Sequence, residues 1–182
     1  MASAKTKKKR ILNGAQIKLI LARFAREMSK QYGNLDQVVF IGIRTRGPYV
    51  AKRLAEIIKK RSGKEIPVGE MDITLYRDDL DVLLPGGTID HTRIPIDIAG
   101  KIVVLFDDVL NTGRTVRAAV DHLIDLGRPR MIHLAVLIDR GGRELPIAAN
   151  YVGKTIKLNV GGNVDVRLKE VDKTDEVLLE QE

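Results

Sequence analysis

The chain contains no cysteine, only three histidines and few aromatic residues, which make up 4% of its 182 residues. Without cysteine, disulfide bonds and thiol chemistry are excluded. The histidines, His91, His122 and His133, are scattered and lack the spacing of metal ligands. The sequence contains no run of about 18 apolar residues, so no membrane-spanning helix is predicted. The N-terminus lacks the apolar core of a signal peptide. We therefore expect a cytoplasmic protein with a largely aliphatic core.

Three common catalytic signatures are also missing. No Gly-x-Gly-x-x-Gly string follows a predicted strand. The segment Gly153-Lys154-Thr155 matches the end of a P-loop, but Ala148 stands where the earlier glycine is required. No serine is marked as the nucleophile of a triad with histidine and aspartate. These absences argue against dinucleotide-binding, P-loop and serine-triad chemistry.

The net charge of +7 is concentrated at one end of the chain. Five of the 31 basic residues lie within residues 1–10, and the rest of the chain has 26 basic and 24 acidic residues. A short basic end is typically disordered and solubilising, so we predict a disordered tail over 1–10 and a single domain over 11–182. Electrostatic contact between the tail and a nucleic acid is the alternative.

The apolar pattern along the rest of the chain alternates between strands and helices, which predicts an α/β fold with a mostly parallel central sheet flanked by helices. Asn13 is a candidate N-cap for the first helix. The predicted helices cover about 14–31, 48–61 and 114–126. The predicted strands cover 37–43, 66–76, 101–106, 131–138, 151–154 and 164–168.

The most informative segment runs from Val103 to Thr115. The apolar run Ile102–Phe106 predicts a strand covered on both faces. Asp107 and Asp108 follow it, and then comes a small-residue loop over 110–115 that opens the predicted helix. Backbone N–H groups and hydroxyls of such a loop, together with the helix N-terminus, form a phosphate cradle. Two carboxylates beside a phosphate site are expected only if the ligand also carries hydroxyl groups or a Mg²⁺ ion.

Two other segments have a functional pattern. Arg44-Thr45-Arg46-Gly47 lies between a predicted strand and a helix, where ligands bind in open α/β sheets, and its two arginines predict an anion site. Residues 77–99 form a long polar excursion with little core pattern, and loops of this length are usually lids or disordered. We therefore predict a mobile lid over 77–99, beginning at Arg77.

The segment 103–115 resembles the phosphoribosyl-pyrophosphate (PRPP) motif of type I phosphoribosyltransferases. Segments 42–47, 72–79, 109–119 and 139–147 extend this resemblance to the bifunctional pyrimidine operon regulatory proteins, the PyrR family, from about Ile11 to Val171. The resemblance implies the type I phosphoribosyltransferase fold, with a lid and a hood. It also implies uracil phosphoribosyltransferase activity, which makes UMP and pyrophosphate from uracil and PRPP, and UMP-dependent binding of pyrimidine-operon leader mRNA.

The resemblance also implies roles for individual residues. Asp107, Asp108 and Arg77 would be catalytic, with the two aspartates on the ribose hydroxyls. Mg²⁺ would arrive with PRPP, with the same aspartates as candidate ligands. The residues expected to bind the PRPP phosphate are Val109, Leu110, Asn111, Thr112, Gly113, Arg114 and Thr115. Those expected to bind pyrophosphate are Arg44, Thr45, Arg46 and Gly47, with a cis peptide between the first two.

The base pocket and the RNA surface are the remaining expectations from the resemblance. Ile138, Asp139 and Arg140 would line the base pocket, unless the last two simply pair with each other. Arg26, Arg143 and Lys154 would contact RNA, although Gly142 and Ala148 replace family residues that are often His and Arg. A homodimer or homotetramer is expected. The alternatives are an RNA-binding regulator with vestigial catalysis and a phosphoribosyltransferase that acts on a purine base.

Overall fold

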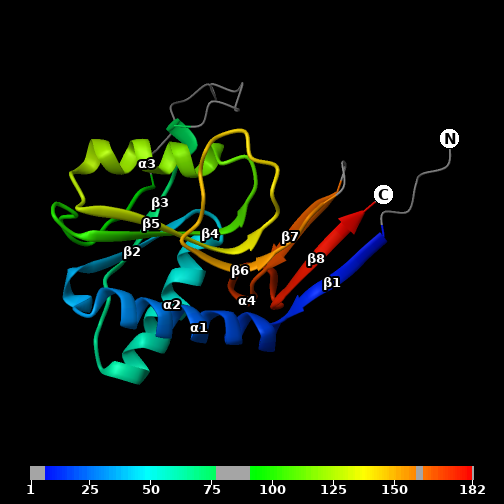
Figure 1. Ribbon diagram of the computed structural model, residues 1–182, viewed down its shortest axis with the longest axis horizontal. Helices are drawn as coiled ribbons and strands as arrows, with labels where there is room; N and C mark the ends of the chain where they lie inside the picture. Colours follow the sequence, from blue (N-terminus) through cyan, green and yellow to red (C-terminus); the bar gives the residue numbers. More distant parts are fainter. Residues whose placement is uncertain (1–6, 77–90, 159–161, 182) are drawn as a thin grey trace.

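The computed structural model describes residues 7–76, 91–158 and 162–181, and the elements are labelled in Figure 1. The helices are α1 (Gly14–Tyr32), α2 (Gly47–Ser62), α3 (Arg114–Leu126) and α4 (Lys169–Asp172), with 3₁₀ turns at η1 (Leu35–Gln37) and η2 (Thr74–Tyr76). The strands are β1 (Lys7–Asn13), β2 (Val38–Ile43), β3 (Val68–Met71), β4 (Ile102–Leu110), β5 (Met131–Asp139), β6 (Tyr151–Thr155), β7 (Asn163–Arg167) and β8 (Glu176–Gln181).

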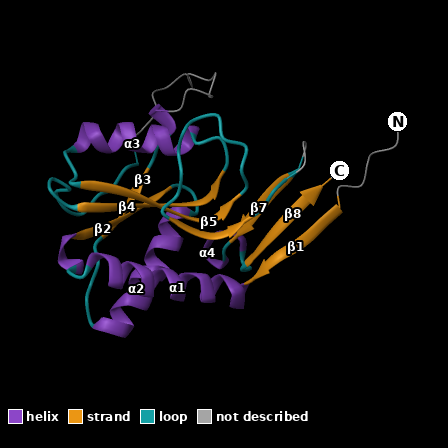
Figure 2. Ribbon diagram, viewed as in Figure 1, coloured by secondary structure: helices purple, strands orange, loops and turns teal. Residues whose placement is uncertain are grey.

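The main sheet has five parallel strands in the order β3-β2-β4-β5-β6. Helices α1 and α2 cover one face and α3 covers the other (Figure 2). Side chains of β2 and β4 alternate between the two faces, as the period of a strand requires. Phe40 and Phe106 pack edge to face, 4.8 Å apart, on the side of α1 and α2, whereas Ile41 and Leu105 pack toward α3. The predicted fold class is therefore confirmed.

Local signals set several helix boundaries. Asn13 caps α1, because its side chain accepts from the Gln16 N–H and the Gln16 side chain accepts from the Asn13 N–H, both at 2.9 Å. Helix α3 begins after Gly113, which has a φ of +94° and so adopts a conformation that favours glycine. Both boundaries match the sequence predictions.

In the described part of the chain, no helix combines the length and the apolar character needed to cross a membrane.

A second sheet, which is antiparallel, has the strand order β1-β8-β7. It brings the two ends of the chain side by side, with Leu12 opposite Val177 (Figure 1). The predicted disordered tail over 1–10 is therefore wrong for residues 7–10, which pair with β8, while residues 1–6 lie outside the described residues. The basic run 7–10 has no strand pattern of its own, and backbone pairing with a distant strand overrides its local preference.

The connection after β3 also differs from the prediction. The expected strand over 66–76 ends at Met71, because the Asp72 carboxylate accepts hydrogen bonds from the Thr74 N–H (3.0 Å) and hydroxyl (2.6 Å) and turns the chain. Farther on, Arg93 forms a backbone bridge with Glu70, and Ile98 is buried. These contacts hold residues 91–99 against the main sheet. The prediction of a mobile lid is therefore wrong for 91–99, and residues 77–90, including Arg77, lie outside the described residues.

Candidate active site

Three loops meet at one edge of the main sheet, because β2, β4 and β5 are parallel neighbours and their carboxyl ends point the same way. The loop 44–47 follows β2, the acidic pair and the loop 111–115 follow the buried part of β4, and residues 138–140 end β5. The structure thus brings together the residues predicted to bind phosphate, pyrophosphate and base.

The acidic pair lies within β4, which runs beyond the predicted end at Phe106. Asp107 is buried, with 7% of its surface exposed, and its Oδ1 accepts the Asp108 N–H at 2.9 Å. Asp108 in turn accepts the Val109 N–H at 2.9 Å. Burial raises the pKa of the Asp108 carboxyl, although the nearby Arg46 guanidinium acts in the opposite direction. Each of the two side chains is therefore oriented by the backbone N–H of the residue that follows it.

The loop that the sequence predicts to bind phosphate, here called the cradle, lies directly before α3. Gly113 has no side chain to cap α3, and the first-turn N–H of Arg114 donates to Oγ1 of Thr112 in the loop at 3.3 Å. The carbonyl of Thr112 accepts from the Glu144 and Leu145 N–H groups at 3.0 and 3.1 Å, which ties the cradle to the loop after β5. This arrangement supplies backbone donors and a positive helix end to an anion.

Arg143 is a clamp on the cradle that the sequence did not predict. Its Nη1 donates to the Asn111 carbonyl at 2.7 Å, and its Nε donates to the Ile147 carbonyl at 2.9 Å. Its Nη2 pairs with Asp139 at 2.6 Å. The guanidinium is thus committed to intramolecular contacts, which argues against the predicted RNA contact. The i,i+4 spacing of Asp139 and Arg143 is the only sequence signal that could have suggested the pair.

The loop 44–47 has the predicted cis peptide between Arg44 and Thr45. The Arg44 N–H donates to the Met71 carbonyl at 2.9 Å. A Cβ added at Gly47 would lie 2.3 Å from the carbonyl oxygen of Phe106, so this loop contacts the β4 backbone directly before the acidic pair. Only glycine permits such a close approach. The side chains of Arg44 and Thr45 are exposed, whereas Arg46 is partly buried.

The predicted base-binding residues differ in availability. Ile138 is fully buried in the core, so its side chain is not exposed to a ligand, and only its backbone could contribute. The Asp139 carboxylate binds the Gly141 N–H at 3.0 Å and Arg143. Arg140 instead donates to Asn163 at 3.1 Å and to the Gly162 carbonyl at 2.6 Å. The alternative in which Asp139 pairs with Arg140 is therefore wrong, and Arg140 links the site to the second sheet.

The other two predicted RNA contacts lie on adjoining elements. Arg26 is exposed on α1 and Lys154 is exposed on β6. Arg23 joins these elements, because its Nη2 donates to the carbonyls of Val152 (2.7 Å) and Gly153 (3.2 Å). The structure therefore keeps Arg26 and Lys154 exposed, although the Lys154 backbone pairs with Ile138 at the end of β5 and its Nζ donates to the Ile11 carbonyl at 3.3 Å.

Comparison with known proteins agrees with this geometry. A family model described as "Phosphoribosyl transferase domain" matches residues 7–170. The hypoxanthine phosphoribosyltransferase of Trypanosoma cruzi has a similar fold, with a TM-score of 0.73, 17% identity, and coverage of 96% of this chain and 97% of that one. A Staphylococcus aureus hypoxanthine phosphoribosyltransferase gives a TM-score of 0.73 at 20% identity, covering 95% of this chain and 91% of that one. The fold and the three loops define a type I phosphoribosyltransferase.

Relatives with higher sequence identity define the family within this class. The "Bifunctional protein PyrR" of Chloroflexus aurantiacus is 53% identical over 171 residues, which are 94% of each chain. The protein of the same name from Thermus thermophilus is 49% identical over 172 residues, covering 94% of this chain and 95% of the relative. The chain therefore belongs to the PyrR family of type I phosphoribosyltransferases, as its sequence motifs predicted.

Proposed function

We propose that this protein transfers the phosphoribosyl group of PRPP to uracil, which gives UMP and pyrophosphate, and that it also binds pyrimidine-operon leader RNA. The observation that carries the enzymatic part is the meeting of the acidic pair, the helix α3 cradle and the loop 44–47 at one sheet edge. These three parts match the ribose, the 5′-phosphate and the pyrophosphate of PRPP in chemistry and in order.

The proposed reaction breaks the bond between C1 of the ribose and pyrophosphate and forms a bond from C1 to N1 of uracil, which loses its proton. Oxocarbenium character develops on the ribose, so catalysis consists of positioning and charge stabilisation without a covalent nucleophile. Asp107 and Asp108 orient the ribose hydroxyls. Arg44 and Arg46 meet the charge that develops on the departing pyrophosphate, and Arg77 is expected to cover it.

A Mg²⁺ ion fits this site only together with the substrate. Among the described residues, no group of three or more His, Cys, Asp or Glu side chains could hold a metal ion. Asp107 and Asp108 supply two carboxylates, so the remaining ligands would be oxygens of PRPP itself. When bound, the ion would neutralise charge on the pyrophosphate.

The choice of uracil rests on the relatives named PyrR, at about half identity over nearly the whole chain. The hypoxanthine phosphoribosyltransferases share the fold at 17–20% identity, which carries no argument about the base. For the RNA role, Arg26 and Lys154 are the accessible candidates. A cytoplasmic location and a homodimer or homotetramer stay predictions that accompany this proposal.

The decisive experiment measures UMP formation from uracil, PRPP and Mg²⁺, beside an identical reaction with hypoxanthine. We expect turnover with uracil alone. Turnover with hypoxanthine but not uracil would replace the base assignment with a purine. Absence of turnover with both bases would favour the RNA-binding regulator or a base other than these two.

Arg143→Ala separates the clamp from the RNA role. The truncation removes Arg143 from two partly buried carbonyls and from Asp139, which we expect to destabilise the protein by about 2 kcal/mol and to raise the KM for PRPP. Thermal unfolding and steady-state kinetics measure the two effects. At saturating UMP, the affinity for a leader hairpin should stay within about twofold, because removing an intramolecular clamp deletes no RNA contact.

Lys154→Ala is the matched control. It removes an exposed cation from β6, so it should lower the affinity for the leader hairpin and leave the KM for PRPP unchanged. If Arg143→Ala weakened RNA binding as much as Lys154→Ala while PRPP binding was unaffected, the clamp interpretation would be wrong.

A further inference from the structure

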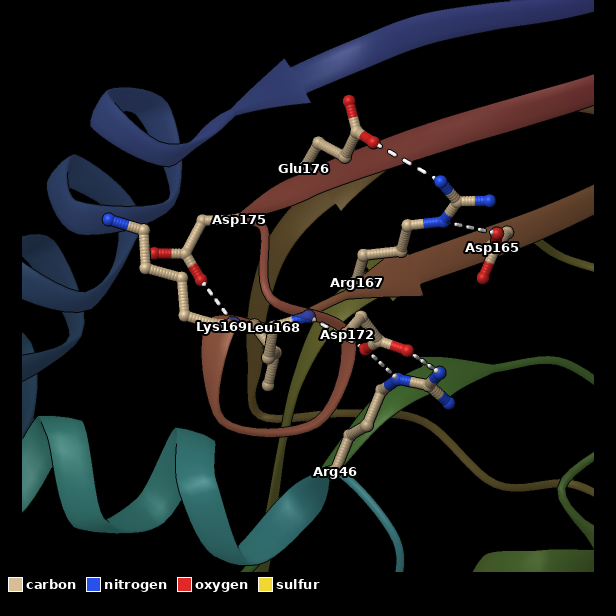
Figure 3. Close-up of polar contacts among 8 residues, drawn as sticks. All are labelled: Arg46, Asp165, Arg167, Leu168, Lys169, Asp172, Asp175 and Glu176. Atoms are coloured by element: carbon tan, nitrogen blue, oxygen red, sulfur yellow. Dashed lines mark hydrogen bonds and ion pairs between the residues drawn. The ribbon is translucent and has the colours of Figure 1, made fainter.

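The guanidinium of Arg46 is fixed by a residue that lies 126 positions away in the sequence. Its Nε donates to Oδ2 of Asp172 at 3.1 Å, and its Nη2 donates to Oδ1 at 2.9 Å, a two-point pairing drawn in Figure 3. Both side chains are mostly buried, with 27% and 20% of their surfaces exposed. Such paired geometry fixes the plane of the guanidinium as well as its distance.

Asp172 is itself held in position by further contacts. Its Oδ2 also accepts the Leu168 N–H at 2.9 Å, which closes the short helix α4 (Figure 3). Helix α4 is tied to α2 by Arg53, which donates to Glu170 at 2.8 Å and pairs with Asp175 at 2.7 Å. The carboxylate is therefore attached to a segment that is anchored on both sides of it.

The pairing leaves one edge of the guanidinium available. Asp172 occupies Nε and Nη2, and Figure 3 shows the third nitrogen, Nη1, pointing away from Asp172. The hydrogen bonds that Arg46 donates to Asp172 raise the pKa of Arg46, and the charge of Asp108 acts in the same direction. The charge of Asp108 thus acts on Arg46, but in the described part of the chain the side-chain hydrogen bonds of Arg46 go to Asp172.

We propose that Asp172 is a positioning residue for the pyrophosphate half of the substrate: it holds Arg46 away from Asp108 and presents the free guanidinium edge to the leaving group. This inference rests on the proposed function. Without Asp172, the guanidinium is released toward Asp108, whose charge already acts on it, and pairing of these two would remove both from the substrate.

The test is Asp172→Asn, which has nearly the same shape but places an N–H₂ group against one of the Arg46 donors. We expect the KM for PRPP, and the dissociation constant of magnesium pyrophosphate measured by calorimetry, to rise about tenfold, equivalent to about 1.4 kcal/mol. The KM for uracil should change less than twofold, because Arg46 belongs to the pyrophosphate loop. A general loss of structure would instead affect both substrates.

Two further variants make the test specific. Glu176→Gln removes a charge from the neighbouring strand β8, where it pairs with Arg167 and not with Arg46 or Arg53, and should leave pyrophosphate affinity unchanged. In an Arg46→Ala background, Asp172→Asn should have no additional effect on pyrophosphate binding, since the two residues act as a unit.

Equal or tighter pyrophosphate binding by Asp172→Asn would overturn the proposal, and tighter binding would show that Asp172 competes with the ligand. Failure of the proposed function has a different appearance, because the wild-type protein itself would then show no turnover. The calorimetric comparison needs no turnover, so the two failures are distinguishable.

Discussion

Asp107→Asn combined with Asp108→Asn should abolish UMP formation while the protein remains folded. An asparagine Oδ1 can still accept the N–H of Asp108 or Val109, so the local backbone hydrogen bonds survive. What is lost is the negative charge beside the ribose, where positive charge develops. Loss of such preorganised stabilisation from two groups should reduce turnover by at least about 1,000-fold.

The measurement pairs single-turnover UMP formation with thermal unfolding. Because burial disfavours the charge on Asp108, its removal should not lower the melting temperature. The matched control is Asp97→Asn, in which an exposed carboxylate accepts the Ala99 N–H at 2.8 Å far from the three loops. Full activity in the double variant would refute the assignment of the acidic pair.

Gly47→Ala should have the second largest effect. The new methyl group would overlap the Phe106 carbonyl oxygen, at 2.3 Å, so the loop 44–47 must move away from β4. A displacement of about 1 Å at a positioning group can reduce the rate about 100-fold, and the overlap should also destabilise the fold by more than about 3 kcal/mol. Steady-state kinetics and denaturant unfolding measure the two effects.

Gly63→Ala is the control for this substitution. Gly63 follows α2 with a φ of +71°, and an added Cβ would meet nothing within 4 Å. It should therefore destabilise by only about 1 kcal/mol through backbone conformation and leave turnover unchanged. If both variants behaved alike, close contact between the loop and β4 would not be what requires glycine at position 47.

Sequence reasoning succeeded where the signal was local. The apolar run Ile102–Phe106 predicted a doubly covered strand, and the loop before Arg114 predicted the start of α3, because period and helix-start signals reside within a few residues. The acidic pair and the loop 44–47 were then placed at one edge by the parallel topology alone. The roles assigned to these residues remain predictions.

The parts that sequence missed depend on distant partners. Lys7–Arg10 was predicted as a tail because nothing in a run of basic residues indicates pairing with β8. The contact of Arg46 with Asp172 joins residues that no pattern connects. Arg143 donates to the backbone carbonyl of Asn111. Because every residue has such a carbonyl, the amino-acid sequence does not mark this contact.

The pairing of β1 with β8 sets the order in which the molecule can be completed during synthesis. Lys7 pairs with Gln181, so β1 can pair with β8 only after residue 181 has been synthesised. Strands β2 to β6 can associate before that point. Contacts between residues so far apart form slowly. The pair of Arg46 and Asp172 can likewise form only after residue 172 has been synthesised, when the acidic pair and the loop before α3 are already present.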